Sequence, residues 1–400
     1  MSSWLETLLS MVDEAESPSQ YWRWAALSAI SAVVKNNVSI DRHIYRLYPN
    51  IYVILVGKSA IKKGPPIALA RNLVARVDNT RVIGGRASIQ GIVKELASTY
   101  TTSKNRTITD SCGFIVSSEF ASSLVEDPAA TNILLDLYDG DYHKDGWKNT
   151  LKGSAQETLV NPSITLLSGS NETNLKDIIS AKERTNGFVG RIFFIPATRR
   201  HTINSLVYAP RIGLDAEQLA GYLRELAVLK GEFVWSKDGG VYYDEWYRTL
   251  AEQIDQDDSD ETGTTNRLGD HVLKVAMLLH LSRCLTLSLD KRDILDAIEA
   301  CQPLIKAAAD ITLGQGSKKD KISPATLLKD LLYVKDHSMS REAWARKYWR
   351  EITINEFDTL VESLRQTGGV EKYTLNNEIH WRMTDWAIQV YSEAQKRKAH

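Results

Sequence analysis

The chain contains little cysteine and no long apolar run. Its three cysteines, Cys112, Cys284 and Cys301, lie far apart and none forms a CxxC pair, which argues against a structural zinc site or a disulfide framework and fits a reducing compartment. No apolar stretch approaches the roughly 20 residues that a membrane-spanning helix needs. We therefore expect a cytoplasmic protein with no membrane association and no metal site built from cysteine and histidine.

Neither sign of charge is in excess. The formal net charge is −1 over 400 residues, of which 43% are hydrophobic and 25% charged, a composition that suits a soluble protein with two or three cores. An acidic run at 255–261 and a basic tail at 396–398 show that opposite local charges cancel. The net charge therefore neither supports nor excludes a nucleic-acid partner.

Strand and helix patterns alternate through the first half of the chain. Residues 1–48 open with two helical patterns and a short strand or hairpin at 38–48. Strand patterns follow at 51–57, 112–118, 163–169 and 190–197. Helical patterns lie between them, at 65–77, 88–100, 131–140 and 174–182. This alternation predicts an α/β domain with a parallel sheet over 49–210.

The first strand of that domain runs into the loop ILVGKSAIKKGPP, at residues 54–66. In a P-loop, backbone amides and a helix N-terminus bind phosphates, a lysine reaches the β and γ phosphates, and a Ser or Thr hydroxyl holds magnesium. With Gly57 as the first glycine, Lys63 takes the lysine position, Lys62 replaces a glycine and Gly64 replaces the hydroxyl residue. The predicted nucleotide-binding residues are Gly57, Lys58, Ser59, Ala60, Lys62, Lys63, Gly64 and Pro65. The alternative is a basic surface turn.

Two later strands end in polar residues. CGFIVSSEF places Glu119 where NTPases carry an acid that activates the attacking water, while Ser118 stands where a second acid is usual. Alternatively, Glu119 stabilises a helix N-terminus. The strand at 163–169 is followed by Asn171, which could sense the γ-phosphate or cap the next helix.

Several segments together carry a resemblance to a known family: ESPSQYWRWAALSAISAVV, YPNIYVILVGKSAIKKGPPIALA, FIVSSEF, LLDLYDGDYHKDGWKN, ITLLSGSNETNL and NGFVGRIFFIPA. They resemble the phage and prophage P-loop proteins catalogued as a domain of unknown function and labelled phage primase or replicative helicase. The resemblance spans roughly residues 15 to 290. It implies a P-loop NTPase fold of the RecA or AAA+ kind, with ATP and Mg²⁺ as cofactors.

The resemblance also suggests roles for two arginines. Arg191 follows a glycine-rich stretch and could act as an arginine finger on the nucleotide of a neighbouring subunit; the alternative is an ion pair within its own chain. Arg267 begins a helical stretch in a predicted helical lid at 211–313, where it could be a sensor-like nucleotide contact or a solvent-facing residue.

A lysine-rich segment precedes the strand at 163–169. Its predicted DNA-binding residues are Lys144, Trp147, Lys148 and Lys152. Lysines meet phosphates and aromatic rings stack on bases, so this loop or hairpin could enter the pore of a ring and contact single-stranded DNA. The alternative is a hairpin that packs on the protein and exposes its lysines.

The end of the chain predicts a separate domain. After a linker at 314–323, residues 324–400 show three helical patterns and two alternating segments, the composition of a winged helix, which binds DNA or docks proteins. We therefore expect an ATP-driven DNA motor that forms a ring, most simply a hexamer. We expect this motor to be the replicative helicase of a phage or mobile element. The alternative is a non-unwinding helicase loader or assembly switch that binds ATP and a replication partner.

Overall fold

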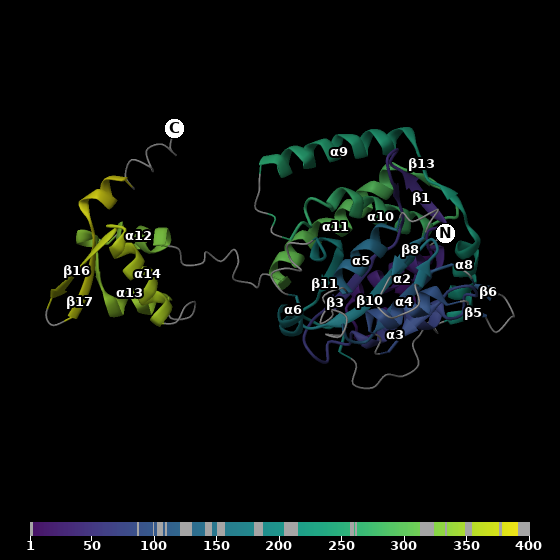
Figure 1. The fold of residues 1–400 in the computed structure, drawn as a ribbon, viewed down its shortest axis with the longest axis horizontal. Helices are drawn as coiled ribbons and strands as arrows, with labels where there is room; N and C mark the ends of the chain where they lie inside the picture. The colour runs from purple at the N-terminus through teal and green to yellow at the C-terminus, as the bar shows by residue number, and fades with distance from the viewer. Residues whose placement is uncertain are drawn as a thin grey trace. The chain divides into compact units, whose positions relative to one another are not determined.

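The computed structural model divides the chain into two compact units, Met1–Gly314 and Gln315–His400 (Figure 1). The division falls at the predicted linker. The structure describes residues 3–85, 88–98, 100–101, 107–108, 110–120, 130–140, 146–149, 157–179, 187–203, 215–256, 260, 262–312, 324–332, 334–348, 354–375 and 378–390.

A five-stranded, all-parallel sheet forms the centre of the first unit. Its strands lie in the order β11-β3-β10-β7-β4. Their bounds are β3 Tyr52–Val56, β4 Val82–Gly84, β7 Cys112–Ser117, β10 Ser163–Ser170 and β11 Ile192–Pro196. The four predicted strands and the parallel sheet are confirmed; the short edge strand β4 was not predicted.

Both faces of the sheet are buried, which explains why its strands are apolar runs and not alternating patterns. Val53 and Leu55 of β3 face one core, which they share with the helices α1, α2, α3, α8 and α10. Tyr52 and Ile54 face a second core, shared with α4, α5 and α6. The bounds are α1 Trp4–Met11, α2 Ser19–Val34, α3 Gly64–Val74, α4 Ile89–Ala97, α5 Ala130–Asp139, α6 Glu172–Ile178, α8 Ala216–Val228 and α10 Leu268–Leu281.

The helices after residue 215 complete the core of this unit. Helix α11, Lys291–Thr312, packs beside β11 and α10, and its buried residues join both cores. Helix α10, in the predicted lid, is buried along almost its whole length. The remaining elements are α9 Lys237–Gln256, η2 Val189–Arg191 and the small strands β1 Val38–Asp41, β2 Arg46–Leu47, β5 Tyr100–Thr101, β6 Thr107–Ile108, β8 Trp147–Asn149, β9 Glu157–Leu159, β12 Gly231–Glu232, β13 Val234–Trp235 and β14 Ser288–Leu289.

The second unit has its own core, built around the fully buried Trp344 and Phe357. Its three antiparallel strands lie in the order β15-β17-β16. The elements are α12 Pro324–Leu332, η3 Lys335–His337, β15 Ser338–Ser340, α13 Arg341–Tyr348, α14 Ile354–Gln366, β16 Val370–Leu375 and β17 Glu378–Met383. Among the described residues, no helix is both long and apolar enough to cross a bilayer.

Candidate functional site

The sheet has a reversal point between its adjacent strands β3 and β10. Helix α3, which follows β3, packs in one core, whereas α6, which follows β10, packs in the other. In open parallel sheets such a reversal leaves a crevice at the carboxyl ends of the strands, where ligands bind. The predicted loop lies there, because the Gly57 amide, directly after β3, donates a 3.1 Å hydrogen bond to the carbonyl of Ser170 at the end of β10.

The loop from Gly57 to Lys63 folds back on itself. Ala60 and Lys62 have φ values of 67° and 64°, in the left-handed region that non-glycine residues seldom adopt. The Lys63 ammonium donates to the carbonyl oxygens of Gly57, at 2.7 Å, and Lys58, at 3.1 Å. The side chain of the predicted phosphate lysine therefore crosses the loop and points back to its start.

Packing from the first core fixes the start of this loop. The Tyr21 hydroxyl donates a 2.6 Å hydrogen bond to the carbonyl of Val56. A Cβ added at Gly57 would lie only 2.7 Å from that hydroxyl and 2.8 Å from the Ala197 carbonyl oxygen. At the other end of the loop, the Ser17 hydroxyl donates to the Lys62 carbonyl at 2.7 Å. Glycine is required at Gly57 because no side chain fits between these groups.

Unpaired backbone amides precede two prolines in this loop. Within the described residues, the amides of Ser59, Lys62 and Lys63 donate to no protein acceptor. Helix α3 begins at Gly64 and carries proline at its next two positions, which have no N–H to donate. A phosphate here would therefore be bound by amides that precede Pro65 and by the Lys63 ammonium.

The end of β7 lies beside the loop. A Cβ added at Gly169 of β10 would lie 2.7 Å from the Ser118 carbonyl oxygen and 3.5 Å from the Cβ of Lys63, so the two segments meet over Gly169. Burial lowers the pKa of Lys63, and the nearby Glu119 carboxylate opposes that shift. The structure therefore brings the predicted acid and the predicted phosphate lysine to one edge of the sheet.

Asn174, which the sequence analysis did not single out, contacts the acid. Its side-chain amide donates a 3.0 Å hydrogen bond to the Glu119 carboxylate. The neighbouring Asn171 caps α6, because its side-chain oxygen accepts the backbone amide of Asn174 at 2.8 Å. Asn171 therefore caps α6, which is the second of the two roles considered for it. The helical pattern at 174–182 did not indicate that Asn174 faces Glu119 at the end of β7.

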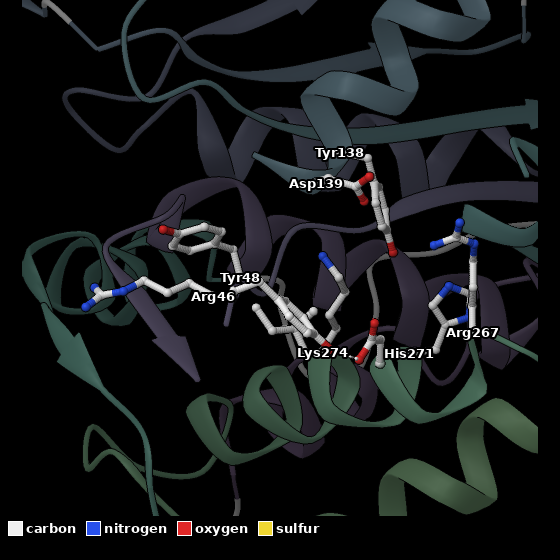
Figure 2. Close-up of a pocket in the computed structure, with 10 residues that line it drawn as sticks. Arg46, Tyr48, Tyr138, Asp139, Arg267, His271 and Lys274 are labelled. Carbon is white, nitrogen blue, oxygen red and sulfur yellow. Dashed lines mark hydrogen bonds between the residues drawn. The ribbon is translucent and has the colours of Figure 1, made fainter. Parts of the chain in front are cut away.

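Arg191 and Arg267 lie at the opposite, amino edge of the sheet. Arg191 precedes β11 and makes a bidentate ion pair with Asp139, at 3.2 and 2.6 Å, as in the intrachain alternative. A Cβ added at Gly187 would lie 3.1 Å from Arg191 and 3.4 Å from Arg267, so the two guanidinium groups are neighbours. Neither arginine contributes to the loop site of its own chain. Figure 2 shows Arg267 with Tyr138, Asp139, His271 and Lys274 around a pocket.

The predicted DNA-contacting hairpin is present as β8 paired with β9. Trp147 is buried and its indole N–H donates a 3.0 Å hydrogen bond to Asp136 of α5. This corrects the prediction that Trp147 stacks on bases, because its ring is packed against the protein. Lys148 is exposed, and Lys144 and Lys152 lie outside the described residues.

An open pocket of about 440 Å³ adjoins the loop on its β11 side. Ala197 belongs to its lining and also approaches Gly57. Three basic residues, Arg199, Arg200 and His201, stand at its margin, and Arg200 pairs with Glu16, which also pairs with Lys62. The pocket is thus partly basic and lies close to the start of the loop, although no loop residue lines it.

Neither the scan against protein-family models nor the search of curated proteins finds a match for this chain. No group of three or more His, Cys, Asp or Glu side chains that could hold a metal ion occurs among the described residues. A Mg²⁺ ion would therefore rely on phosphate oxygens and water, its usual partners in nucleotide sites, with Glu119 as the nearby carboxylate.

Proposed function

We propose that this protein binds ATP at the carboxyl edge of its sheet and uses it to drive a ring-shaped motor on single-stranded DNA, as a replicative helicase of a phage or mobile element. The observation that carries the proposal is the convergence of Lys63, Glu119 and Asn174 at the reversal point of the sheet. This is the edge at which parallel α/β proteins bind their ligands.

The proposed chemistry divides between the loop and the acid. The unpaired amides of the loop and the Lys63 ammonium would bind the phosphates. To do so, Lys63 would give up its hydrogen bonds to the carbonyl oxygens of Gly57 and Lys58 and form stronger ones to charged phosphate oxygens. Glu119, held by Asn174, would orient the attacking water and accept its proton. Mg²⁺, when bound with ATP, would neutralise phosphate charge.

Support for the DNA-binding part comes from exposed basic residues. Lys148 lies on the surface of the β8–β9 hairpin. The second unit, which we propose is a winged helix, has the basic residues Arg341, Lys347, Arg365 and Arg382, which pair with carboxylates of the same unit. The exposed pairs, those of Arg365 and Arg382, are weak and can exchange for DNA phosphates.

The start of α3 favours a second candidate, an ATP-binding helicase loader or assembly switch that does not unwind DNA. Gly64 has no hydroxyl for Mg²⁺, and Pro65 and Pro66 remove two amide donors. Binding without efficient turnover would suit such a site.

The two candidates separate in one set of assays on the full chain. We expect ATP hydrolysis that single-stranded DNA stimulates, together with displacement of a strand from a forked duplex. Glu119→Gln should keep ATP binding and lose turnover, whereas Glu95→Gln, an exposed glutamate on α4, should change neither. ATP-dependent assembly without turnover would instead establish the switch. Absence of ATP binding by the parent chain would contradict both.

A further inference from the structure

A second pocket of the first unit lies at the amino edge of the sheet. The loop at 57–63 lies at the opposite, carboxyl edge. The volume of the pocket is about 300 Å³, at the lower end of the range for ligand pockets. It is lined by Tyr45, Arg46, Leu47, Tyr48, Tyr138, Asp139, Arg267, Asp270, His271 and Lys274. In Figure 2 the side chain of Tyr138 descends from α5 and that of Lys274 rises from α10 toward the same space.

Two buried polar atoms of this lining have no hydrogen-bond partner. The Tyr138 hydroxyl and His271 Nε2 are both unpaired within the described residues, although these residues are only 4% and 3% exposed. Unpaired buried polar atoms cost about 1–3 kcal/mol each and are uncommon in folded proteins. Their presence together in the wall of one pocket makes this pocket a candidate ligand site.

Two of the three cations in the lining, Arg267 and Lys274, make no ion pair with a carboxylate among the described residues, whereas Arg46 pairs with Glu232. Lys274 is 3% exposed, and its ammonium donates to the side-chain and backbone oxygens of Asn50, at 2.7 and 3.1 Å, and lies 4.2 Å from the centre of the Tyr138 ring. Arg267 makes no ion pair with any described residue. Of the two acids, Asp139 is already paired with Arg191, while Asp270 accepts a hydrogen bond from Tyr45 at 3.2 Å.

The protonation states agree with a site that donates hydrogen bonds. Burial raises the pKa of Tyr138 well above its usual value, so its hydroxyl keeps its proton. Burial, with the charge of Lys274, lowers the pKa of His271 to about 3, so the imidazole is neutral and donates from its unpaired Nε2 in the tautomer that carries the proton there. Burial also lowers the pKa of Lys274 to about 7, against the opposing effect of Asp270 and Asp139, which leaves this lysine charged only in part at neutral pH.

We propose that this pocket binds a small anion carrying a carboxylate or phosphate group, held by Arg267 and Lys274 and by hydrogen bonds from Tyr138 and His271. This site is separate from the proposed ATP site and does not depend on it. An anion would supply the directly paired negative charge that Arg267 and Lys274 lack and the acceptor that the Tyr138 hydroxyl lacks. It would also favour the charged form of Lys274, so binding should take up protons and weaken as the pH rises above 7.

The test uses the full chain with two probes, inorganic phosphate and malonate, followed by calorimetry and thermal unfolding. Lys63→Ala serves as the background, because it should weaken any phosphate binding at the loop. We expect saturable binding of at least one probe in this background, weaker by about threefold or more at pH 8.5 than at pH 6.5. Binding of phosphate but not malonate would show that the pocket takes phosphate groups, and binding of malonate but not phosphate would show that it takes carboxylates.

Three substitutions assign the binding to the pocket. Tyr138→Phe removes the unpaired hydroxyl, so it should leave the melting temperature without anion unchanged or higher, yet cut the anion-induced rise. Arg267→Gln and Lys274→Met should weaken binding tenfold or more, and Lys274→Met should abolish the pH response. If Lys63→Ala alone removes all binding, or if none of the three substitutions weakens it, the pocket is not an anion site.

Discussion

The side-chain amide of Asn174 donates a 3.0 Å hydrogen bond to the carboxylate of Glu119. Glu119 follows β7, whereas Asn174 lies in the first turn of α6, so this contact fixes the acid relative to α6. If Glu119 orients the attacking water, Asn174 is its positioning residue. We expect Asn174→Ala to lower kcat about tenfold with little change in KM, because the acid stays but its orientation is lost. Steady-state ATP turnover measures both constants.

Thr173 provides the matched control for that substitution. It is adjacent and exposed, so Thr173→Ala should leave turnover as it is. Equal losses in both variants would mean that the start of α6, and not the contact with Glu119, matters. Partial recovery in Asn174→Gln would support the hydrogen bond itself.

Lys63 should govern nucleotide affinity. Its ammonium lies within the loop, whereas Lys58 is exposed. We expect Lys63→Ala to weaken ATP binding by roughly 10- to 100-fold, in line with about 1.5–3 kcal/mol for hydrogen bonds to charged groups, and Lys58→Ala to have a small effect. Fluorescent-nucleotide titration gives both values. The reverse ranking would mean that the loop register is wrong.

Gly169 should be intolerant of a side chain. A methyl group there would lie 2.7 Å from the Ser118 carbonyl oxygen, so the end of β7 or the loop must move. Gly169→Ala is expected to destabilise the protein by about 1–3 kcal/mol and to weaken ATP binding. Gly221→Ala, with nothing within 4 Å of the new methyl, should be neutral or slightly stabilising. Urea unfolding compares the two variants, and similar behaviour would show that Gly169 is not a close-contact position.

The ion pair of Arg191 with Asp139 should be structural. The Arg191 side chain is 10% exposed and that of Asp139 58%, so breaking the pair should cost about 1–3 kcal/mol, less than for a fully buried pair. Arg191→Ala and Asp139→Asn should then lower the melting temperature by similar amounts.

A role in a neighbouring subunit has a different signature. Arg191→Ala would then fold normally and bind ATP but not hydrolyse it, and mixing it with the inactive Glu119→Gln variant would restore turnover through interfaces that combine the two intact residues. Restored turnover in rings that exchange subunits would therefore replace the structural interpretation with the arginine finger.

Acid should destabilise the protein through Asp293. Burial alone would raise the pKa of this carboxyl, but hydrogen bonds from His280, the Asp290 amide and Arg283 hold it below the usual value. A lowered pKa in the folded state stabilises the protein above about pH 4, the value of an unfolded aspartate, and this contribution is lost as the pH falls through the folded pKa.

The measurement is urea unfolding of the parent and of Asp293→Asn at pH 7 and pH 3. At pH 7 the substitution should cost about 3 kcal/mol, because it leaves Arg283 without one partner. At pH 3 the difference should shrink. A constant difference across this range would show that the Asp293 charge does not contribute.

Local sequence determined which elements form and where several of them end. Runs of β-branched residues such as Ile51 to Val56 predicted buried strands, and the break at Gly57 predicted the loop, because both depend on nearby residues. The parallel sheet followed from the alternation of strands and helices. The short strand β4 was missed, since three residues carry too little pattern to distinguish a strand from a loop.

Tertiary structure decided which polar side chains meet. Asn174 reaches Glu119 only because β10 lies between β3 and β7 in the sheet, an order that no local pattern encodes. Packing likewise turned Trp147 into the core and placed Arg191 and Arg267 at the amino edge, beside buried residues from α5 and α10. The sequence could name these residues, but the contacts among segments far apart in the chain, which bury some groups and leave others unpaired, determine what each can bind.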